Sequence, residues 1–235
     1  MSTFPEPLPH GPIEELFPDV FVVQSTVRMN ALVSFPRNMI IVREGKSLTL
    51  INAVRLSAEG EKALEALGKV EHLVKLGFFH TLDDPYTRHR FSPKFWAPAP
   101  GDASTEKLVE GGPSPLSKAS VFCFARAKQG EAALLLEQPQ GTLLITCDSV
   151  QNWASTAGCS LMGAITLRAM GFITPAKIGP IWLKSMTGGK IGEMKPDFDR
   201  LISHDFAHLI AGHGVLLRDG AKDALVRSMA RTFRG

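Results

Sequence analysis

The sequence predicts a mixed α/β fold of the α+β kind, and three observations lead to this class. Residues 47–80 pass from a strand pattern to a helix pattern and back to a strand, which indicates a β-α-β unit. Residues 120–148 hold three short apolar runs separated by glycine turns, which is typical of a strand meander. Residues 219–233 form an amphipathic helix pattern that closes the chain.

The first part of the chain is expected to supply an arm and then strands. Residues 1–18 are rich in proline and polar residues, so we expect an extended N-terminal arm followed by one domain over residues 19–235. Gly45 lies between two polar residues and predicts a tight turn between two strands. The expected strands are the β-branched runs 19–25, 38–44 and 47–56.

A helix and a further strand are expected next. Ser57 can cap the helix at its N-terminus, and Gly68 can end it in a left-handed conformation. The apolar run 71–79 then predicts a buried strand that delivers His80 to its C-terminal edge, where open sheets place ligands.

The second half alternates regions that are easy and hard to assign. Residues 85–118 are rich in Pro, Gly and Ser and are expected to be irregular, with one short helix or strand near residues 94–97. No assignment is made for residues 171–195. The expected elements are strands at 120–127, 131–138 and 141–148, a helix with an apolar face from Leu161 to Met170, a helix at 195–205, and a short strand that runs into His213.

Composition excludes several classes of function. The 235 residues carry a net charge of +3 that is spread along the chain, which argues against a nucleic-acid footprint. Three cysteines without C-x-x-C spacing favour a reduced, cytoplasmic protein. The N-terminus does not resemble a secretory signal. The most apolar helical run, residues 161–173, is too short to span a bilayer, so no membrane partner is expected.

Four residues at expected strand ends form the candidate site. His80 is followed by Asp83 and Asp84, Asp148 ends the strand in LLITCDS, and His213 lies between two glycines. Imidazole nitrogens and carboxylate oxygens are the ligands of zinc, iron and manganese sites, and three protein ligands with one open position suit a catalytic zinc.

Each of these residues also has a purely structural interpretation. His80 could bond a loop carbonyl, Asp148 could cap the turn begun by Ser149, and His213 could be a packing residue. The nearby histidines could replace a missing ligand, but their spacing does not require it, and they are expected to lie at the surface or in packing contacts: His89, His204 and His208.

The order of these elements and motifs resembles the metallo-β-lactamase superfamily. The family motif H-x-H-x-D-H, laid on HTLDDP, matches His80 as its first histidine and Asp84 as its aspartate. The segment TCDS, with Asp148, looks like the one that supplies the bridging aspartate, and AGHG, with His213, looks like the late histidine. The resemblance implies an αββα sandwich of two mixed sheets flanked by helices, with a metal site at one edge between the sheets.

The sequence also departs from the family motif. Leu82 stands where the second histidine is expected, Pro85 replaces the third, and residues 111–121 supply no histidine. The first metal position of the family therefore keeps only His80. The second position keeps three of its four ligands, so the resemblance implies a single metal held by Asp84, Asp148 and His213, with His80 beside it.

Two functions follow as expectations. The first is a metal-dependent hydrolase in which one divalent transition metal, zinc rather than iron or manganese, activates water against an ester, lactone, amide or phosphoester of a small-molecule substrate. Asp84 would serve as ligand and as the base that orients the water. The alternative is a non-catalytic protein of this fold that has lost its metal and serves as a binding module. The sequence leaves a homodimer open.

Overall fold

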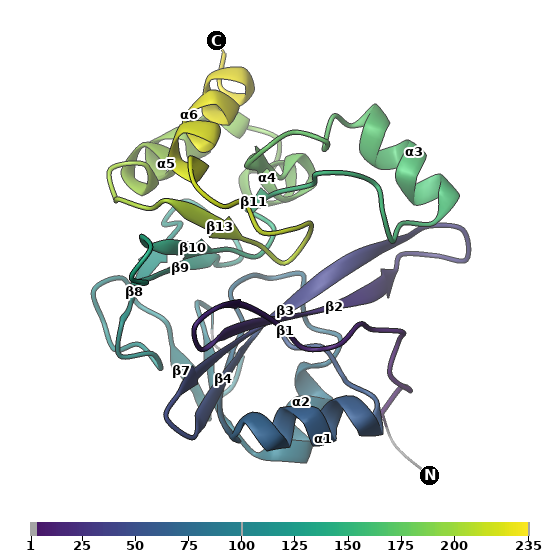
Figure 1. Cartoon of the computed structure of the whole chain (residues 1–235). Coiled ribbons are helices and arrows are strands. Elements are labelled where there is room, and N and C mark those ends of the chain that lie inside the picture. Colours follow the sequence, from purple (N-terminus) through teal and green to yellow (C-terminus); the bar gives the residue numbers. More distant parts are fainter. Residues whose placement is uncertain (1–3, 100, 235) are drawn as a thin grey trace.

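The computed structural model describes residues 4–99 and 101–234, and it contains two β-sheets that face one another (Figure 1). The strands of the larger sheet follow the chain order. The first four pair antiparallel and the last four pair parallel. They are β1 (Glu14–Phe17), β2 (Val20–Arg28), β3 (Ser34–Glu44), β4 (Ser47–Ile51), β5 (Lys69–Val74), β6 (Lys94–Ala97) and β7 (Thr105–Lys107).

The smaller sheet has the order β13-β10-β9-β8, and its strands pair antiparallel except for β10 and β13, which are parallel. A further pair, β11 and β12, lies after β10 in the chain. The strands are β8 (Ala119–Cys123), β9 (Ala132–Leu136), β10 (Leu143–Ile145), β11 (Val150–Gln151), β12 (Lys177–Ile178) and β13 (His208–Ile210).

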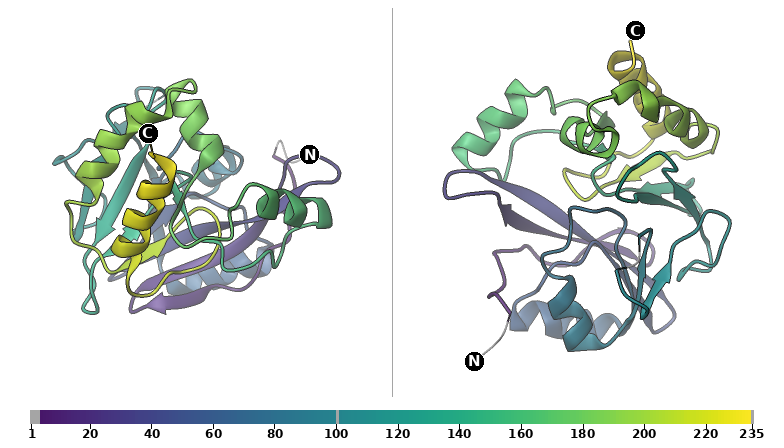
Figure 2. Two further views of the ribbon diagram at one scale, coloured as in Figure 1. Left: turned by 90° about the horizontal axis from the view of Figure 1, so that it is seen from above. Right: turned by 180° about the vertical axis from the view of Figure 1, so that it is seen from behind.

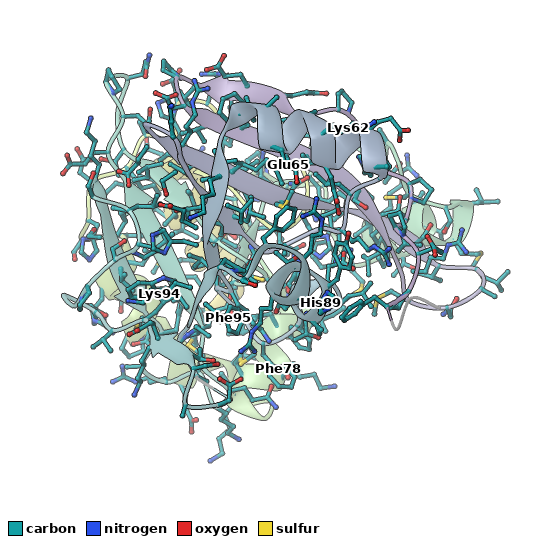
Figure 3. The ribbon with its side chains drawn as sticks, turned by 90° about the horizontal axis from the view of Figure 1, so that it is seen from below. Lys62, Glu65, Phe78, His89, Lys94 and Phe95 are labelled. Atoms are coloured by element: carbon teal, nitrogen blue, oxygen red, sulfur yellow. The ribbon has the colours of Figure 1, made fainter. Side chains whose placement is uncertain are left out.

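Helices cover the outer faces of both sheets. Figure 3 shows α1 (Ala58–Leu67) and α2 (Asp84–Phe91) over the larger sheet, with the exposed Lys62 and Glu65 on α1. In both views of Figure 2, α3 (Leu161–Ala169) lies beside the β2–β3 hairpin. The smaller sheet is covered by α4 (Pro180–Thr187), the short 3-10 helix η1 (Ile191–Met194), α5 (Lys195–Leu201) and α6 (Ala221–Thr232). This is the αββα sandwich that the sequence led us to expect.

The core is divided by the strands into layers. On β3, Ile40 and Val42 point between the sheets, while Met39 and Ile41 point toward α1, because successive strand residues face opposite sides. All four side chains are buried, which explains why the sequence of this central strand is a continuous apolar run. On the outer face of the smaller sheet, the third layer of core residues includes Trp182, Phe198 and Leu225.

Most of the expected elements are present, with shifted bounds. The turn at Gly45 is confirmed by its φ of 64°, and Ser57 caps α1 by accepting a hydrogen bond from Gly60 N at 3.2 Å. The expected arm, residues 1–18, contains strand β1, which pairs with β2. No helix among the described residues is both long and apolar enough to cross a membrane.

One expectation about the region around the site is wrong, and a second is incomplete. The apolar run 71–79 does not form one strand: β5 ends at Val74, and Phe78 and Phe79 lie in a bend with exposed side chains. Residues 85–118 are largely irregular, and the short element expected near residues 94–97 is β6, but this stretch also contains most of α2, which begins at Asp84, and β7. Pro85 lies in the first turn of α2, where a missing backbone N–H costs nothing.

Candidate metal centre

Two of the predicted site residues are brought together by a parallel pair of strands. Strands β10 and β13 pair in register, with Leu143 opposite His208 and Ile145 opposite Ile210. Parallel strands end at the same sheet edge. The loops that carry Asp148 and His213 therefore leave the smaller sheet side by side.

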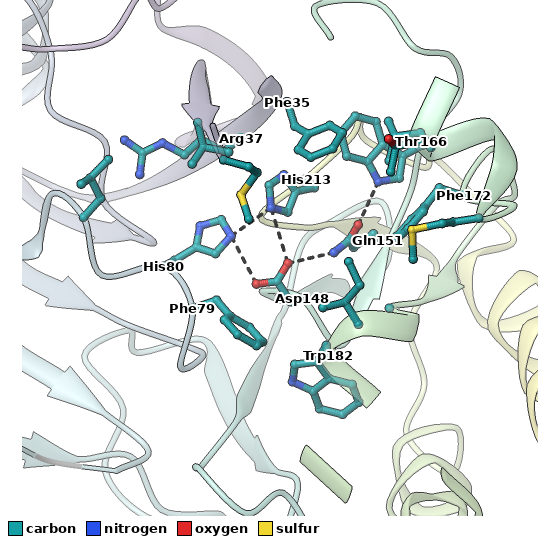
Figure 4. Close-up of a pocket in the computed structure, with 18 of the residues that line it drawn as sticks. Phe35, Arg37, Phe79, His80, Asp148, Gln151, Thr166, Phe172, Trp182 and His213 are labelled. Carbon is teal, nitrogen blue, oxygen red and sulfur yellow. Dashed lines mark hydrogen bonds and ion pairs between the residues drawn. The ribbon is translucent and has the colours of Figure 1, made fainter. Parts of the chain in front are cut away.

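The third residue comes from the larger sheet. His80 lies in the loop between β5 and α2 and approaches the other two from across the space between the sheets (Figure 4). Its Nε2 is 3.2 Å from Nε2 of His213 and 3.4 Å from Oδ2 of Asp148. Nε2 of His213 is 3.5 Å from Oδ1 of Asp148. Both sheets thus contribute to one cluster, whose ligand atoms all lie within 4.8 Å of one another.

His213 is held with Nε2 directed into the cluster. Its Nδ1 lies 2.7 Å from the backbone oxygen of Pro36, which can only accept, so Nδ1 carries the proton and Nε2 presents its lone pair. The ring of Trp153 stacks on the imidazole, with 5.8 Å between the ring centroids and 17° between the ring planes. Burial lowers the pKa of His213, which keeps the ring neutral and able to bind a metal.

The loop that carries His213 is fixed to β3. The side-chain amide of Asn38 donates to the backbone oxygens of Ala211 and Gly214, each at 2.9 Å. Its backbone N–H donates to Gly212 O at 2.8 Å. Gly214 has a φ of 88°, a conformation that residues with a Cβ rarely adopt. The glycine that follows His213 is therefore explained by the backbone path.

Asp148 is held as a carboxylate. Gln151 Nε2 donates to its Oδ1 at 2.8 Å, and Gln151 in turn accepts from Trp153 Nε1 at 2.9 Å. Burial raises the pKa of Asp148, but the neighbouring His80 and then His213 outweigh burial and bring the pKa down to about 2. An ionised carboxylate is the form that binds a metal.

His80 is positioned by close packing rather than by a hydrogen bond behind it. Its Nδ1 is buried and has no hydrogen-bond partner among the described residues. A Cβ added at Gly212 would lie 3.0 Å from Cε1 of His80, which is tighter than most Cβ contacts in proteins. Glycine at this position therefore makes room for the imidazole, which is a second reason for the GHG segment.

The donor set fits a divalent transition metal. Zinc–nitrogen distances of about 2.0–2.1 Å place two tetrahedral ligand atoms about 3.3–3.4 Å apart. The three separations in the cluster are 3.2, 3.4 and 3.5 Å. Because Nε2 of His213 carries a lone pair, a proton or a cation must lie between it and the facing Nε2 of His80. Two imidazoles and a carboxylate are also the chemical set of a catalytic zinc site.

Asp84 lies outside this cluster. It begins α2, is 6% exposed, and lines a separate cavity of about 540 Å³ together with Lys75 and Arg88. Its Oδ1 has no hydrogen-bond partner among the described residues. Burial raises the pKa of Asp84 to about 6, opposed by the charges of Lys75 and His80. The side chain of Asp84 faces this second cavity and not the cluster. The role of Asp84 as metal ligand and base stays a prediction.

Asp83, the alternative carboxylate of the same loop, has a different partner. It forms an ion pair with Arg37 and accepts a hydrogen bond from the backbone N–H of Arg55 at 2.9 Å. His208 is buried too, and its Nδ1 accepts from Asp219 N at 3.0 Å. Among the described residues, the cluster that could hold a metal ion consists of His80, Asp148 and His213. It includes none of the other candidates: Asp83, His89, His204 and His208.

The cluster lies in a cavity of about 270 Å³ whose other residues were not anticipated from the sequence (Figure 4). Gln151 and Trp153 orient Asp148 and His213, and Phe79 and Trp182 contribute to the walls. The sequence VQNW carried one usable signal, a glutamine and an asparagine in an otherwise apolar stretch. Buried amides of this kind need partners. The partners of Gln151 are Asp148 and Trp153 of the site, whereas Asn152 bonds the backbone of Val215 and Ala176.

Comparisons with known proteins identify the fold through solved structures and not through sequence. No protein-family model matches the sequence. No curated protein sequence matches it either. The solved structures similar to this chain include the metallo-β-lactamase FIM-1 from Pseudomonas aeruginosa, at 12% identity and a TM-score of 0.66, with 98% of this chain and 99% of that chain covered.

Two further structures have the same arrangement. A metallo-β-lactamase from Erythrobacter litoralis is 10% identical with a TM-score of 0.57, and the match covers 96% of each chain. A flavo di-iron protein mutant from Thermotoga maritima is 11% identical with a TM-score of 0.62, and the match covers 93% of this chain and 61% of that one. With these likenesses over nearly its whole length, the chain has the fold of the metallo-β-lactamase superfamily.

Proposed function

We propose that this protein is a hydrolase that holds one divalent transition metal, zinc rather than iron or manganese, through His80, Asp148 and His213. In the reaction, one water adds across an ester, lactone, amide or phosphoester bond of a small molecule, and a proton goes to the leaving group. The observation that carries the proposal is the triangle of three ligand atoms with sides of 3.2, 3.4 and 3.5 Å. The similar FIM-1 structure is described as a mono-zinc form, which agrees with one ion.

The side chains of the site would each have a defined task. A bound divalent ion supplies Lewis acidity toward an oxygen of the substrate or of water. Gln151 keeps the carboxylate of Asp148 turned toward the histidines, and Pro36 O keeps the lone pair of His213 directed inward. Phe79, Trp153 and the rest of the apolar wall exclude bulk water, which strengthens electrostatic interactions inside the cavity.

A specific observation favours a second function. Leu82 stands where the superfamily motif has a histidine, and it lines the cavity instead. A protein that has exchanged a ligand for an apolar wall residue would suit binding without catalysis. The second candidate is therefore a metal-free binding module that uses the same cavity.

Metal analysis of the purified full-length protein separates the two functions. We expect about one zinc, iron or manganese per chain, lost in Asp148→Asn and in His213→Gln. His204→Gln is the matched control, because His204 is exposed and lies outside the cluster. The metal-bearing protein should hydrolyse carboxylic esters, and chelation should abolish the activity.

Absence of metal after incubation with Zn²⁺, Fe²⁺ and Mn²⁺ would refute the hydrolase and leave the binding module. Equal metal content in Asp148→Asn and the parent protein would refute the ligand assignment. Metal without hydrolysis of any ester, lactone, amide or phosphoester would show a metal site that serves another purpose.

A further inference from the structure

The cavity that contains the three ligand residues has a predominantly apolar wall. Strands β2 and β3, the His80 loop, α3 and α4 each contribute to it (Figure 4). The apolar side chains that line it are Val27, Met29, Phe35, Phe79, Leu82, Trp153, Leu167, Met170, Phe172, Ile181 and Trp182. Its volume of about 270 Å³ is near the lower end of the range for small-molecule sites.

The apolar side chains near the mouth are exposed. Met29 is 66% exposed, Ile181 59%, Leu82 48%, Phe79 41% and Met170 37%. These five residues come from four different segments, and all five line this cavity. An exposed apolar cluster around a pocket marks a surface that a ligand covers, because water otherwise contacts it at a cost.

The cavity offers no free positive charge. Apart from His80, Asp148 and His213, the only charged residue that the structure places in its lining is Arg37. Arg37 forms an ion pair with Asp83, and its side chain is 4% exposed. In Figure 4 its guanidinium points away from Asp148 and the histidines. A phosphate or carboxylate on the substrate would therefore find no free cationic side chain in the wall.

The departure from the metal motif contributes to this surface. Leu82 occupies the place of the second histidine and presents an apolar side chain to the cavity. Leucine in place of histidine at this position thus leaves the site with one ligand fewer and adds apolar surface beside the remaining ligands.

We propose that the substrate is an uncharged carboxylic ester or lactone that carries an extended apolar group, and that this group lies against Met29, Leu82 and Ile181. The proposal rests on the hydrolase function proposed above. It narrows that function, since it excludes phosphoesters and anionic substrates. The apolar group contributes binding through burial, while the carbonyl lies at the polar floor of the cavity.

Binding is tested without catalysis by titrating the protein with the neutral dye N-phenyl-1-naphthylamine and following its fluorescence. We expect saturable binding to the parent protein and to Asp148→Asn, which lacks the carboxylate but keeps the wall. Ile181→Gln should weaken binding at least about threefold, since it removes apolar contact. Ile191→Gln is the matched control, because Ile191 is 42% exposed on η1 and lies outside the cavity.

Substrate preference is tested on the zinc-loaded protein with two ester series measured by acid release. One lengthens methyl acetate to methyl octanoate, and the other lengthens methyl acetate to octyl acetate. We expect kcat/KM to rise roughly fourfold for each methylene that enters the cavity, in at least one series. The rise should be smaller in Ile181→Gln and unchanged in Ile191→Gln.

The outcomes distinguish this inference from the function on which it rests. Ester hydrolysis that does not respond to chain length, together with no saturable dye binding, overturns the apolar-substrate inference and leaves the hydrolase standing. A preference for a phosphoester over carboxylic esters also overturns the apolar-substrate inference and leaves the hydrolase standing. Dye binding that Ile181→Gln weakens, without turnover of any ester, lactone, amide or phosphoester, supports an apolar cavity and refutes the hydrolase. Equal effects of the two glutamine variants would refute the assignment of the wall.

Discussion

Gly212 and His80 show how a single backbone position can decide whether a site exists. His80 has no hydrogen-bond partner behind its Nδ1 within the described chain, so its orientation depends on packing. The close approach to Gly212 is the contact that such packing requires. Most metal-binding histidines are instead held by a hydrogen bond from the second ring nitrogen.

Gly212→Ala should therefore weaken metal binding by about 10- to 100-fold, the range seen when the support of a ligand is removed. The added methyl group would lie 3.0 Å from Cε1 of His80, so the ring would have to shift by a few tenths of an ångström from its place in the cluster. Zinc affinity can be measured by competition with a chromophoric chelator. Gly192→Ala is the control, because a Cβ there meets no atom within 4 Å. Unchanged affinity in Gly212→Ala would contradict this account of His80.

Asp84 gives a pH-dependent prediction. Its folded-state pKa of about 6 lies above the ordinary value of 3.8, because burial disfavours the charged form. The stability associated with this group is therefore present at low pH and is lost as the pH rises through about 6. In metal-free protein, Asp84→Asn should raise the free energy of unfolding at pH 8 by up to about 3 kcal/mol, with little gain at pH 4.

Urea unfolding at the two pH values measures this difference, with the exposed Asp205→Asn as control. A loss of stability at pH 8 would show that the carboxylate has a partner in the folded protein. A loss of bound metal from Asp84→Asn would favour the ligand role that the sequence predicted.

Helix α3 is attached to the β2–β3 hairpin at Ser160, whose backbone N–H donates to Ser34 O at 3.1 Å and whose hydroxyl group makes further bonds. Ser160 Oγ accepts hydrogen bonds from Ser34 N at 3.1 Å and Gly163 N at 3.2 Å, and it donates to Leu32 O at 2.8 Å. The N-cap of α3 is thus also the link between two walls of the cavity. Exposed apolar residues on α3 and the hairpin depend on it for their relative position.

Ser160→Ala should destabilise the protein by about 1–2 kcal/mol and also weaken binding of the neutral dye. Ser57→Ala is the matched control, because Ser57 caps α1 in the same way, and α1 covers the face of the larger sheet that is turned away from the smaller sheet (Figure 1). It should show a similar loss in Tm with no change in dye affinity. Equal dye affinities in all three proteins would show that α3 does not depend on this link.

The metal cluster joins the two sheets of the molecule. His80 follows a strand of the larger sheet, while Asp148 and His213 follow strands of the smaller one. A bound ion would therefore cross-link the two halves of the sandwich, and unfolding would have to release it. Zinc at about 100 times its Kd should add about 2.7 kcal/mol to the stability.

Thermal unfolding with and without zinc measures this contribution. Tm should rise with zinc concentration in the parent protein and stay constant in Asp148→Asn. A zinc-dependent rise of the same size in the variant would place the bound ion elsewhere on the chain.

The sequence alone was sufficient to predict the αββα architecture, through its resemblance to a known family. Its four candidate ligands include the three that lie together, His80, Asp148 and His213, and also Asp84, which lies apart from them. Strand and helix periods are local properties, and a ligand directly after a strand can be recognised from a few neighbours. The same local reasoning failed at residues 77–79, whose apolar run looks like a strand. Those residues lie in a bend, and Phe78 and Phe79 remain exposed. It also failed at α2, whose polar sequence DPYTRHRF has no apolar period.

Only the tertiary structure decided how the candidate ligands are grouped. Asp83, Asp84 and His80 are near neighbours in the chain, yet they face Arg37, a separate cavity and the ligand cluster respectively. The direction of each side chain depends on where α2 begins and on contacts with residues far away in sequence. The apolar cavity likewise unites the hairpin, the His80 loop, α3 and α4. Such long-range contacts leave no local pattern, because the segments that line the cavity lie far apart in the sequence.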